Sequence, residues 1–394
     1  MSTITKNTSV TLNGSTSFKL GIDTYTWDNH FLFVVDSWVP DADPIRTVTY
    51  TLSGNSWGAA FVHFGGNTKA IINDTTTGTE ANGKTVYIDF IAFANAGPNT
   101  VTLKNAEVGV INGYNSVDTV SIGYYANAVL LGRGDDILTL SGAGEVGNAN
   151  MGRGDDTLTI GSGYLGSADM GRGNDTVKVG SGGFDFINLS RDADIIKFSA
   201  SSNGGIVNAG EGVSDDLPGA KDFDTADFSA FSEALTIDLG AGTASSGDNV
   251  FFEIRAFEKA IGGTGNDTLR GSAGADVLDG GAGLDKLYGF GGADIFVFEK
   301  GDTGKTQATA DTIYDFTSAD SIDLSNWDAD SSKTGTQDFA FVGTKAFSGD
   351  AGELRYTKTA SDTWIEGDTN GDKVADFIIH LDDAVALKAT YFDF

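Results

Sequence analysis

The sequence contains no cysteine and only 4 prolines in 394 residues. The absence of cysteine excludes disulfides, zinc–thiolate sites and cysteine nucleophiles. No stretch of about 18 apolar residues occurs, so we expect no transmembrane segment. The first twenty residues also lack the apolar core of about 7 to 15 residues that a cleavable signal peptide needs. We therefore expect that export, if it occurs, depends on another signal.

Basic residues are also scarce, with 25 Lys and Arg against 55 Asp and Glu, which gives a formal charge of −30. Such a charge repels phosphate backbones and disfavours nucleic acid as a partner. It also opposes compaction unless cations lie between the carboxylates, so a divalent metal is expected. The hydrophobic fraction of 40 % and the 54 glycines fit a folded, turn-rich protein rather than a disordered one.

Short apolar runs separated by polar turns predict an all-β fold along the chain. In residues 1–100, runs such as HFLFVVDSWV and TVTYTLSG predict an N-terminal β-sandwich-like domain. Aromatic residues gather there between Tyr25 and Trp38. They fit either the core of that domain or an exposed platform that binds a ligand.

Residues 101–208 repeat with a period near 19. The segments LGRGDDILTL, MGRGDDTLTI, MGRGNDTVKV and LSRDADIIKF place Asp136, Asp156, Asp175 and Asp194 at intervals of 20, 19 and 19 residues, and a weaker copy surrounds Asp118. A glycine turn, a strand, a second turn and a second strand make one coil of a parallel β-roll or β-helix. The uneven length of these coils predicts an insertion at the turn opposite the aspartates.

Residues 209–260 break this period and are predicted to form a bridging β segment. Residues 261–300 then contain four nonapeptides in unbroken register, beginning at Gly262, Gly271, Gly280 and Gly289. Each approximates G-G-x-G-x-D-x-apolar-x, the known calcium-binding repeat of RTX proteins. The glycines leave carbonyl groups uncovered, the aspartate supplies a carboxylate, and the apolar eighth residue points into the roll. Calcium prefers about six to eight such oxygen ligands.

These nonapeptides resemble those of the RTX (repeats-in-toxin) exoproteins, in which each calcium ion lies between turns two repeats apart. The resemblance implies that the earlier turn supplies carbonyls two and four with its aspartate, and the later turn supplies carbonyls one and three with its aspartate. One ion would be bound by Gly263, Gly265 and Asp267 with Gly280, Ala282 and Asp285. A second would be bound by Ser272, Gly274 and Asp276 with Gly289, Gly291 and Asp294.

The coils of residues 101–208 keep G-R-G-(D/N)-D in one half-coil only, so the resemblance implies calcium mainly along one side. The candidate ligands are Gly132, Gly134 and Asp136 with Met151, Arg153 and Asp156; Gly152, Gly154 and Asp156 with Met170, Arg172 and Asp175; and Gly171, Gly173 and Asp175 with Leu189, Arg191 and Asp194. The alternative is a metal-free β-helix in which Arg133, Arg153, Arg172 and Arg191 neutralise the aspartates.

Residues 301–394 resemble the C-terminal region of serralysin-type exoproteins in DTIYDFTSADSIDLS, FSGDAGELRY and the ending ATYFDF. The resemblance implies a β-rich cap with an uncleaved signal for the type I secretion machinery, and hence an extracellular or bacterial cell-surface location. Asp368, Asn370, Asp372 and Asp376 have the spacing of an EF-hand loop, but Lys373 occupies its glycine position. This favours a turn without an ion.

The sequence carries no H-E-x-x-H motif, and we find no catalytic motif that would define an enzyme. The favoured hypothesis is a secreted protein that binds several calcium ions, folds on extracellular calcium and assembles into a surface layer, sheath, filament or matrix. Its partners would be copies of itself or a cell-surface polysaccharide. The alternative is a secreted carbohydrate- or surface-binding adhesin, or a hydrolase, whose activity lies in residues 1–100.

Overall fold

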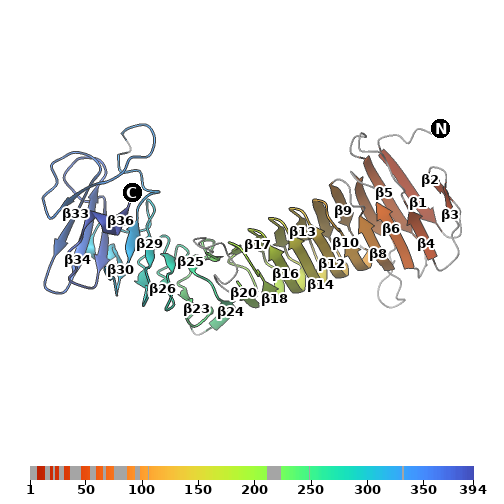
Figure 1. Cartoon of the computed structure of the whole chain (residues 1–394), viewed down its shortest axis with the longest axis horizontal. Coiled ribbons are helices and arrows are strands. Elements are labelled where there is room, and N and C mark those ends of the chain that lie inside the picture. Colours follow the sequence, from red (N-terminus) through yellow and green to blue (C-terminus); the bar gives the residue numbers. More distant parts are fainter. Residues whose placement is uncertain are drawn as a thin grey trace. The chain divides into compact units, whose positions relative to one another are not determined.

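The computed structural model describes β-strands in residues 1–93 and then residues 98–394 except 105, 211–222, 248 and 331; before residue 98 it describes side chains only at 88 and 90–93. Helix in the described residues is limited to η2 (Gln307–Thr309) and η3 (Ala389–Tyr391) (Figure 1). The predicted all-β fold is confirmed. No helix in this part of the chain has the length and apolar composition required to cross a membrane.

A first compact unit comprises Met1–Ile195 and Ser201–Pro218. From residue 99 on, its strands form two parallel ladders. One contains β9 (Asn99–Leu103), β11 (Asp118–Ile122), β13 (Ile137–Leu140), β15 (Thr157–Ile160) and β17 (Thr176–Val179). The other contains β10 (Glu107–Asn112), β12 (Tyr125–Arg133), β14 (Glu145–Arg153), β16 (Tyr164–Arg172), β18 (Gly183–Asn188) and β20 (Ile206–Asn208). Alternation between the ladders makes the predicted parallel solenoid.

The described strands before residue 94 extend these same ladders. β1 (Asn7–Asn13), β5 (Arg46–Ser53) and β7 (Thr68–Asp74) lead to β9, and β4 (Phe31–Val35), β6 (Ala59–Phe64) and β8 (Tyr87–Phe93) lead to β10, all in parallel. Among these strands only β2 (Phe18–Leu20) and β3 (Asp23–Tyr25) pair antiparallel. The pairing thus differs from the sandwich-like domain expected for residues 1–100. Apolar runs are common to sandwich strands and to parallel strands, so the sequence pattern does not distinguish them.

Side-chain alternation explains why the middle coils stack. Val120, Leu138, Leu158 and Val177 are paired in register on successive coils, and all four are buried. Their neighbours in the strands point outwards, as the period of two requires. Burial of a continuous apolar row therefore fixes the register of each coil on the next.

The expected insertion lies at the turn opposite the aspartates. Leu140 pairs with Ile160, whereas Glu145 pairs with Tyr164 on the same two coils. The first pair is further apart in the sequence than the second by a single position. The change in coil length therefore falls within residues 141–144. The strands on either side keep their register, so the prediction is confirmed.

A second compact unit comprises Ile196–Ala200 and Gly219–Phe394. One parallel ladder contains β21 (Thr225–Asp227), β25 (Lys259–Ile261), β27 (Val277–Asp279), β29 (Ile295–Val297), β31 (Ser321–Asp323) and β36 (Phe392–Asp393). The other contains β22 (Thr236–Asp238), β26 (Thr268–Arg270), β28 (Lys286–Tyr288) and β30 (Asp311–Ile313). The eighth residues of the nonapeptides, Leu269, Leu278, Leu287 and Phe296, are fully buried between these ladders.

Antiparallel strands complete this unit. β23 (Thr243–Ser246) and β24 (Asn249–Arg255) pair beside β22. In the C-terminal cap, β33 (Glu353–Lys358), β34 (Thr363–Asp368) and β35 (Phe377–Leu381) pair antiparallel, while β32 (Ala340–Gly343) joins β33 and β35 joins β30 in parallel. The cap thus continues the sheet of the roll, as a β-rich C-terminal cap should.

Candidate metal centre

The aspartates of the nonapeptides form a buried row along each side of the roll. On one side, Asp267 N–H donates to Asp285 Oδ1 over 2.7 Å, and Asp285 N–H donates to Asp311 Oδ1 over 2.8 Å. Each aspartate therefore stands one coil above the next, where the turn meets the strand. One carboxylate oxygen is used to join neighbouring coils.

The other side repeats this arrangement. Asp276 N–H donates to Asp294 Oδ1 over 2.9 Å, and Asp294 N–H donates to Asp320 Oδ1 over 3.0 Å. All three aspartates are buried. Two equivalent carboxylate rows thus follow from the nine-residue period, because successive repeats alternate between the sides.

The structure brings the six predicted ligands of the first site together on two stacked turns. Ala282 N–H donates to the Gly263 carbonyl over 3.1 Å. A Cβ added to Gly283, whose φ is +156°, would lie 2.1 Å from the Gly265 carbonyl oxygen. Glycine at position 283 is therefore required for the close stacking of the turns that carry Asp267 and Asp285.

The predicted second site is built in the same way. Asp276 Oδ2 accepts a 2.5 Å hydrogen bond from Ser272 N–H within its own turn. A Cβ on Gly292 would meet the Gly274 carbonyl oxygen at 2.0 Å. Residues 272–276 and 289–294 consequently stack, which brings the six predicted ligand residues onto neighbouring turns.

The electrostatics of the first site fit a cation. Asp285 Oδ2 is buried and has no hydrogen-bond partner. Burial, followed by the nearby carboxylates of Asp311 and Asp267, raises the pKa of Asp285 to about 9. Burial likewise raises the pKa of Asp311 to about 8. A buried carboxylate oxygen without a hydrogen-bond donor can serve as one of the oxygen ligands that calcium prefers.

The middle coils carry a single, longer row of aspartates. Asp118, Asp136 and Asp156 donate their N–H groups to Oδ1 of Asp136, Asp156 and Asp175, each over 2.7 Å. Asp175 N–H continues the row by donating to Asp194 Oδ1 over 2.6 Å. In this unit the row follows the side predicted to bind calcium.

In four of these carboxylates, one oxygen has no hydrogen-bond partner. Oδ2 of Asp118, Asp136, Asp156 and Asp175 is buried without a hydrogen-bond partner. Burial is the main cause that raises the pKa of Asp136 and Asp175 to about 8, of Asp156 to about 7 and of Asp118 to about 6. Without a cation, Asp136 and Asp175 therefore favour their protonated forms near neutral pH.

The turns that carry this row of aspartates require glycine. Gly152 has φ +110°, and a Cβ there would lie 2.0 Å from the Gly132 carbonyl oxygen. The carbonyls of Arg153 and Arg172 accept hydrogen bonds of 2.8 Å from Gly134 and Gly154. The predicted ligands of successive coils thus stack. The two arginine carbonyls already use one lone pair to join the coils.

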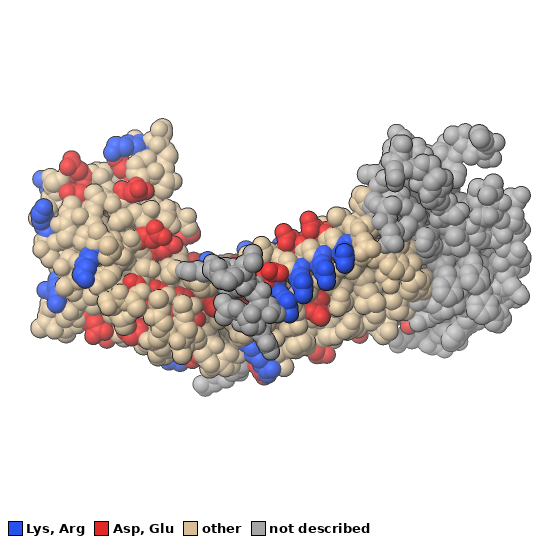
Figure 2. Space-filling view, viewed as in Figure 1, with Lys and Arg blue, Asp and Glu red and all other residues tan. Residues whose placement is uncertain are grey.

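The four arginines of these turns form a row of their own. Arg133 pairs in register with Arg153, Arg153 with Arg172, and Arg172 with Arg191. All four are exposed, and Figure 2 shows basic side chains aligned over these coils. Arg133, Arg153 and Arg172 form no ion pair within 4.0 Å of a described acidic residue. Direct neutralisation of the aspartates by arginine, the metal-free alternative, is therefore not seen at these three positions.

The sequence prediction missed Asp311 and Asp320, which extend the two rows of the roll. Each lies 26 residues after the aspartate it follows, so neither belongs to a nonapeptide. The available signal was the D-x-apolar unit in Asp311-Thr312-Ile313 and Asp320-Ser321-Ile322. The same unit begins the strand of every nonapeptide.

In the EF-hand-like loop, the carboxylate oxygens accept hydrogen bonds from other groups of the same loop. Asp368 Oδ1 accepts from Gly371 N–H over 2.7 Å, and its Oδ2 accepts from Lys373 N–H over 2.9 Å. Asp376 Oδ2 accepts from Thr369 N–H and Oγ1 over 3.0 and 2.7 Å. These bonds stabilise the turn.

The aromatic residues between Tyr25 and Trp38 lie outside the described side chains. The alternative function in residues 1–100 therefore stays a prediction.

A parallel β-solenoid whose stacked glycine turns carry buried aspartates is an RTX-type β-roll. Residues 218–392 match the family model of the peptidase M10 serralysin C terminus, so this part of the chain is a serralysin-type C-terminal region. RTX-type solenoids of this kind generally bind calcium, and the serralysin C-terminal region is associated with type I secretion. No curated protein matches the chain.

Proposed function

We propose that the chain is a secreted calcium-binding protein whose rolls fold when they meet extracellular calcium. The observation that carries the proposal is the set of buried carboxylates with orphaned oxygens, at Asp136, Asp156, Asp175 and Asp285. Ionised carboxylates are costly to bury without a partner. Extracellular calcium modules bind at about 10⁻⁴ to 10⁻³ M, so the rolls would stay unfolded in the cytosol and fold outside.

We also propose that the protein is a structural, self-assembling component of a bacterial surface or matrix. Repeated parallel coils account for most of the described residues, and such coils stabilise their neighbours along the solenoid axis. A second copy of the chain could add to exposed strand edges in the same way. The proposed assembly needs no catalytic group.

An acidic cell-surface polysaccharide is the second candidate partner. The in-register row Arg133, Arg153, Arg172 and Arg191 supports it, because strands about 4.8 Å apart present guanidinium groups at a regular spacing. Guanidinium groups bind carboxylate groups in two-pronged geometry. This partner would dock on the middle coils.

A calcium titration of the full chain tests both parts of the proposal. Calcium is raised from chelator to about 10 mM, well above the expected affinity, with circular dichroism reporting folding and light scattering reporting size. Folding that coincides with growth of particles supports assembly, and magnesium in place of calcium is the control. A folded monomer at the highest calcium concentration would remove the assembly proposal, and β-structure unaffected by calcium would remove the folding proposal.

A further inference from the structure

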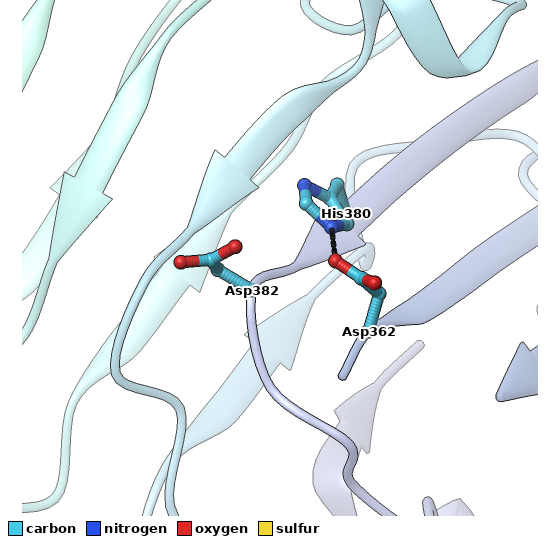
Figure 3. A group of neighbouring side chains, drawn as sticks. All are labelled: Asp362, His380 and Asp382. Atoms are coloured by element: carbon cyan, nitrogen blue, oxygen red, sulfur yellow. Dashed lines mark hydrogen bonds and ion pairs between the residues drawn. The ribbon is translucent and has the colours of Figure 1, made fainter. Parts of the chain in front are cut away.

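A histidine and two aspartates meet on one face of the C-terminal cap. β34 and β35 pair antiparallel, with Trp364 opposite His380 and Thr363 opposite Leu381. One step further, this register places Asp362 opposite Asp382. His380 and Asp382 are two positions apart and therefore share a face. Figure 3 shows the three side chains together at the ends of these strands.

The three side chains are close enough to share an ion. His380 Nε2 lies 3.0 Å from Asp362 Oδ1. One ligand atom from each of Asp362, His380 and Asp382 lies within 4.8 Å of the others. Small rotamer changes at the exposed Asp382 would bring the three atoms to a common centre about 2.0–2.2 Å away.

The surroundings hold the imidazole in the orientation that a metal ligand needs. Its Nδ1 lies 3.1 Å from Thr312 Oγ1, on the strand paired with β35. The Trp364 ring stacks on it with centroids 3.9 Å apart and planes 13° apart. Histidines that ligate metals usually donate their other N–H to a neighbouring oxygen, which fixes the tautomer. Thr312 is placed to accept that hydrogen bond.

Charge also favours a cation here. Asp362 and Asp382 lie just beyond the paired ends of β34 and β35, with carboxylate oxygens close enough to repel, so a positive charge between them stabilises the cap. Protonated His380 can supply that charge to Asp362 at 3.0 Å, and a bound metal ion can supply it to both carboxylates. The Asp362 carboxylate is further oriented by hydrogen bonds from Ser361 Oγ and Thr359 Oγ1. The group is therefore a built arrangement rather than a chance gathering of surface acids.

We propose that Asp362, His380 and Asp382 bind one zinc-class transition-metal ion, at a site separate from the calcium turns. One imidazole nitrogen with two carboxylate oxygens suits Zn²⁺, whereas calcium prefers about six to eight oxygens and no nitrogen. Three protein ligands leave a fourth position for water or for a group from a partner. The assignment goes beyond the proposed calcium-dependent folding and does not depend on it.

The test is a zinc titration of the full chain, stripped of metals and then saturated with calcium, by isothermal calorimetry. We expect one zinc ion per chain at this site and, with cobalt as a probe, absorption typical of nitrogen and oxygen ligation. Asp382→Asn and His380→Asn should each weaken zinc binding at least about tenfold. Thr312→Val, which removes the partner of Nδ1, should weaken it by about 10- to 100-fold.

Asp383→Asn is the matched control, because Asp383 is the adjacent exposed acid and lies outside the cluster. It should bind zinc as the unaltered chain does, and circular dichroism in calcium checks that each variant folds. Asp382 is exposed, so its variant should fold in any case. The absence of zinc binding at about 1 mM in the unaltered chain, or equal binding by the Asp382→Asn variant, would overturn the proposal.

Discussion

At the scale of single residues, the two carboxylate oxygens of Asp285 have different roles. Asp285 Oδ1 accepts a hydrogen bond from Asp267 N–H, whereas its buried Oδ2 has no partner. The first oxygen joins two coils, and the second is free for an ion. An asparagine at this position can keep the first task and loses the charge needed for the second.

Asp285→Asn should therefore separate folding from calcium binding. The calcium concentration at the midpoint of folding should rise by roughly tenfold, because the ion loses a charged ligand. Without calcium, the variant should be at least as stable as the unaltered chain, since it buries one ionisable carboxyl group fewer. Circular dichroism during calcium titration measures both, with Asp383→Asn as the control. An unchanged midpoint would show that Asp285 is not a ligand.

Two alanine substitutions test whether close stacking of the turns requires glycine. At Gly152, φ is +110° and a Cβ would lie 2.0 Å from the Gly132 carbonyl oxygen. At Gly142, φ is +59° and no atom lies within 4 Å of a Cβ. Gly142→Ala should cost about 1 kcal/mol of unfolding free energy from the backbone conformation alone.

Gly152→Ala should cost more, by about 1–3 kcal/mol, because the backbones must also separate. Urea unfolding of both variants in calcium gives the comparison. Equal losses would mean that close stacking of the turns does not limit stability.

At the scale of strands and coils, the sequence predicted what depends on a local period. The nine-residue period predicted which residues of the roll point inwards, and the apolar eighth residue of each nonapeptide is buried. The coil from Lys286 to Thr312 departs from that period. These two residues pair on neighbouring coils, yet their separation in the sequence exceeds two nonapeptides. Residues 298–310, which include η2, account for the added length. A long insertion hides the continuation at Asp311 from any search by period.

The N-terminal strands show a second reason why strand pairing could not be predicted from the sequence. Strand β4, with five apolar residues in Phe31–Val35, has no alternation that would assign it to a sandwich or to a solenoid. Only pairing between strands far apart in the sequence decides this, as with β4 and β6. The arrangement at Asp362 and His380 was missed for the same reason, because 18 residues separate two groups that antiparallel pairing brings together.

The junction between coils gives a prediction at Asp311. Its Oδ1 accepts the buried N–H of Asp285 over 2.8 Å. Asp311→Ala should leave that N–H unsatisfied and cost about 1–3 kcal/mol, whereas Asp311→Asn retains an acceptor and should cost less. Thermal unfolding in calcium compares the two. The proposed role as an acceptor would be wrong if both variants lost the same stability.

At the scale of the whole molecule, the buried aspartate rows couple protons and calcium. The pKa of Asp136, Asp175 and Asp311 is raised to about 8 and that of Asp285 to about 9, chiefly by burial. In the unfolded chain such groups titrate near pH 3.9. Between about pH 4 and pH 9 the calcium-free folded state therefore binds more protons than the unfolded state. Its stability must fall as pH rises through this window.

Carboxyl groups whose pKa is lowered in the folded state affect its stability only below about pH 4. Hydrogen bonds from Lys333 and Ser332 lower the pKa of Asp330 to about 2, so its stabilisation is lost only as pH falls towards that value. Calcium acts in the opposite direction to protons on the rows, because it binds ionised carboxylates and competes with protons for them. A rise in pH should thus strengthen calcium binding while it weakens the calcium-free fold.

The calcium-free chain should consequently keep more β-structure at pH 5 than at pH 8. In saturating calcium the difference should vanish or reverse, since the ions replace the protons that are lost. Circular dichroism at both pH values, with and without calcium, measures the β-structure under the four conditions, and urea unfolding measures the stability wherever the chain is folded. Asp285→Asn should reduce the pH dependence of the calcium-free chain, because one of the groups responsible is removed. A calcium-free chain more stable at pH 8 than at pH 5 would show that the buried rows do not govern folding.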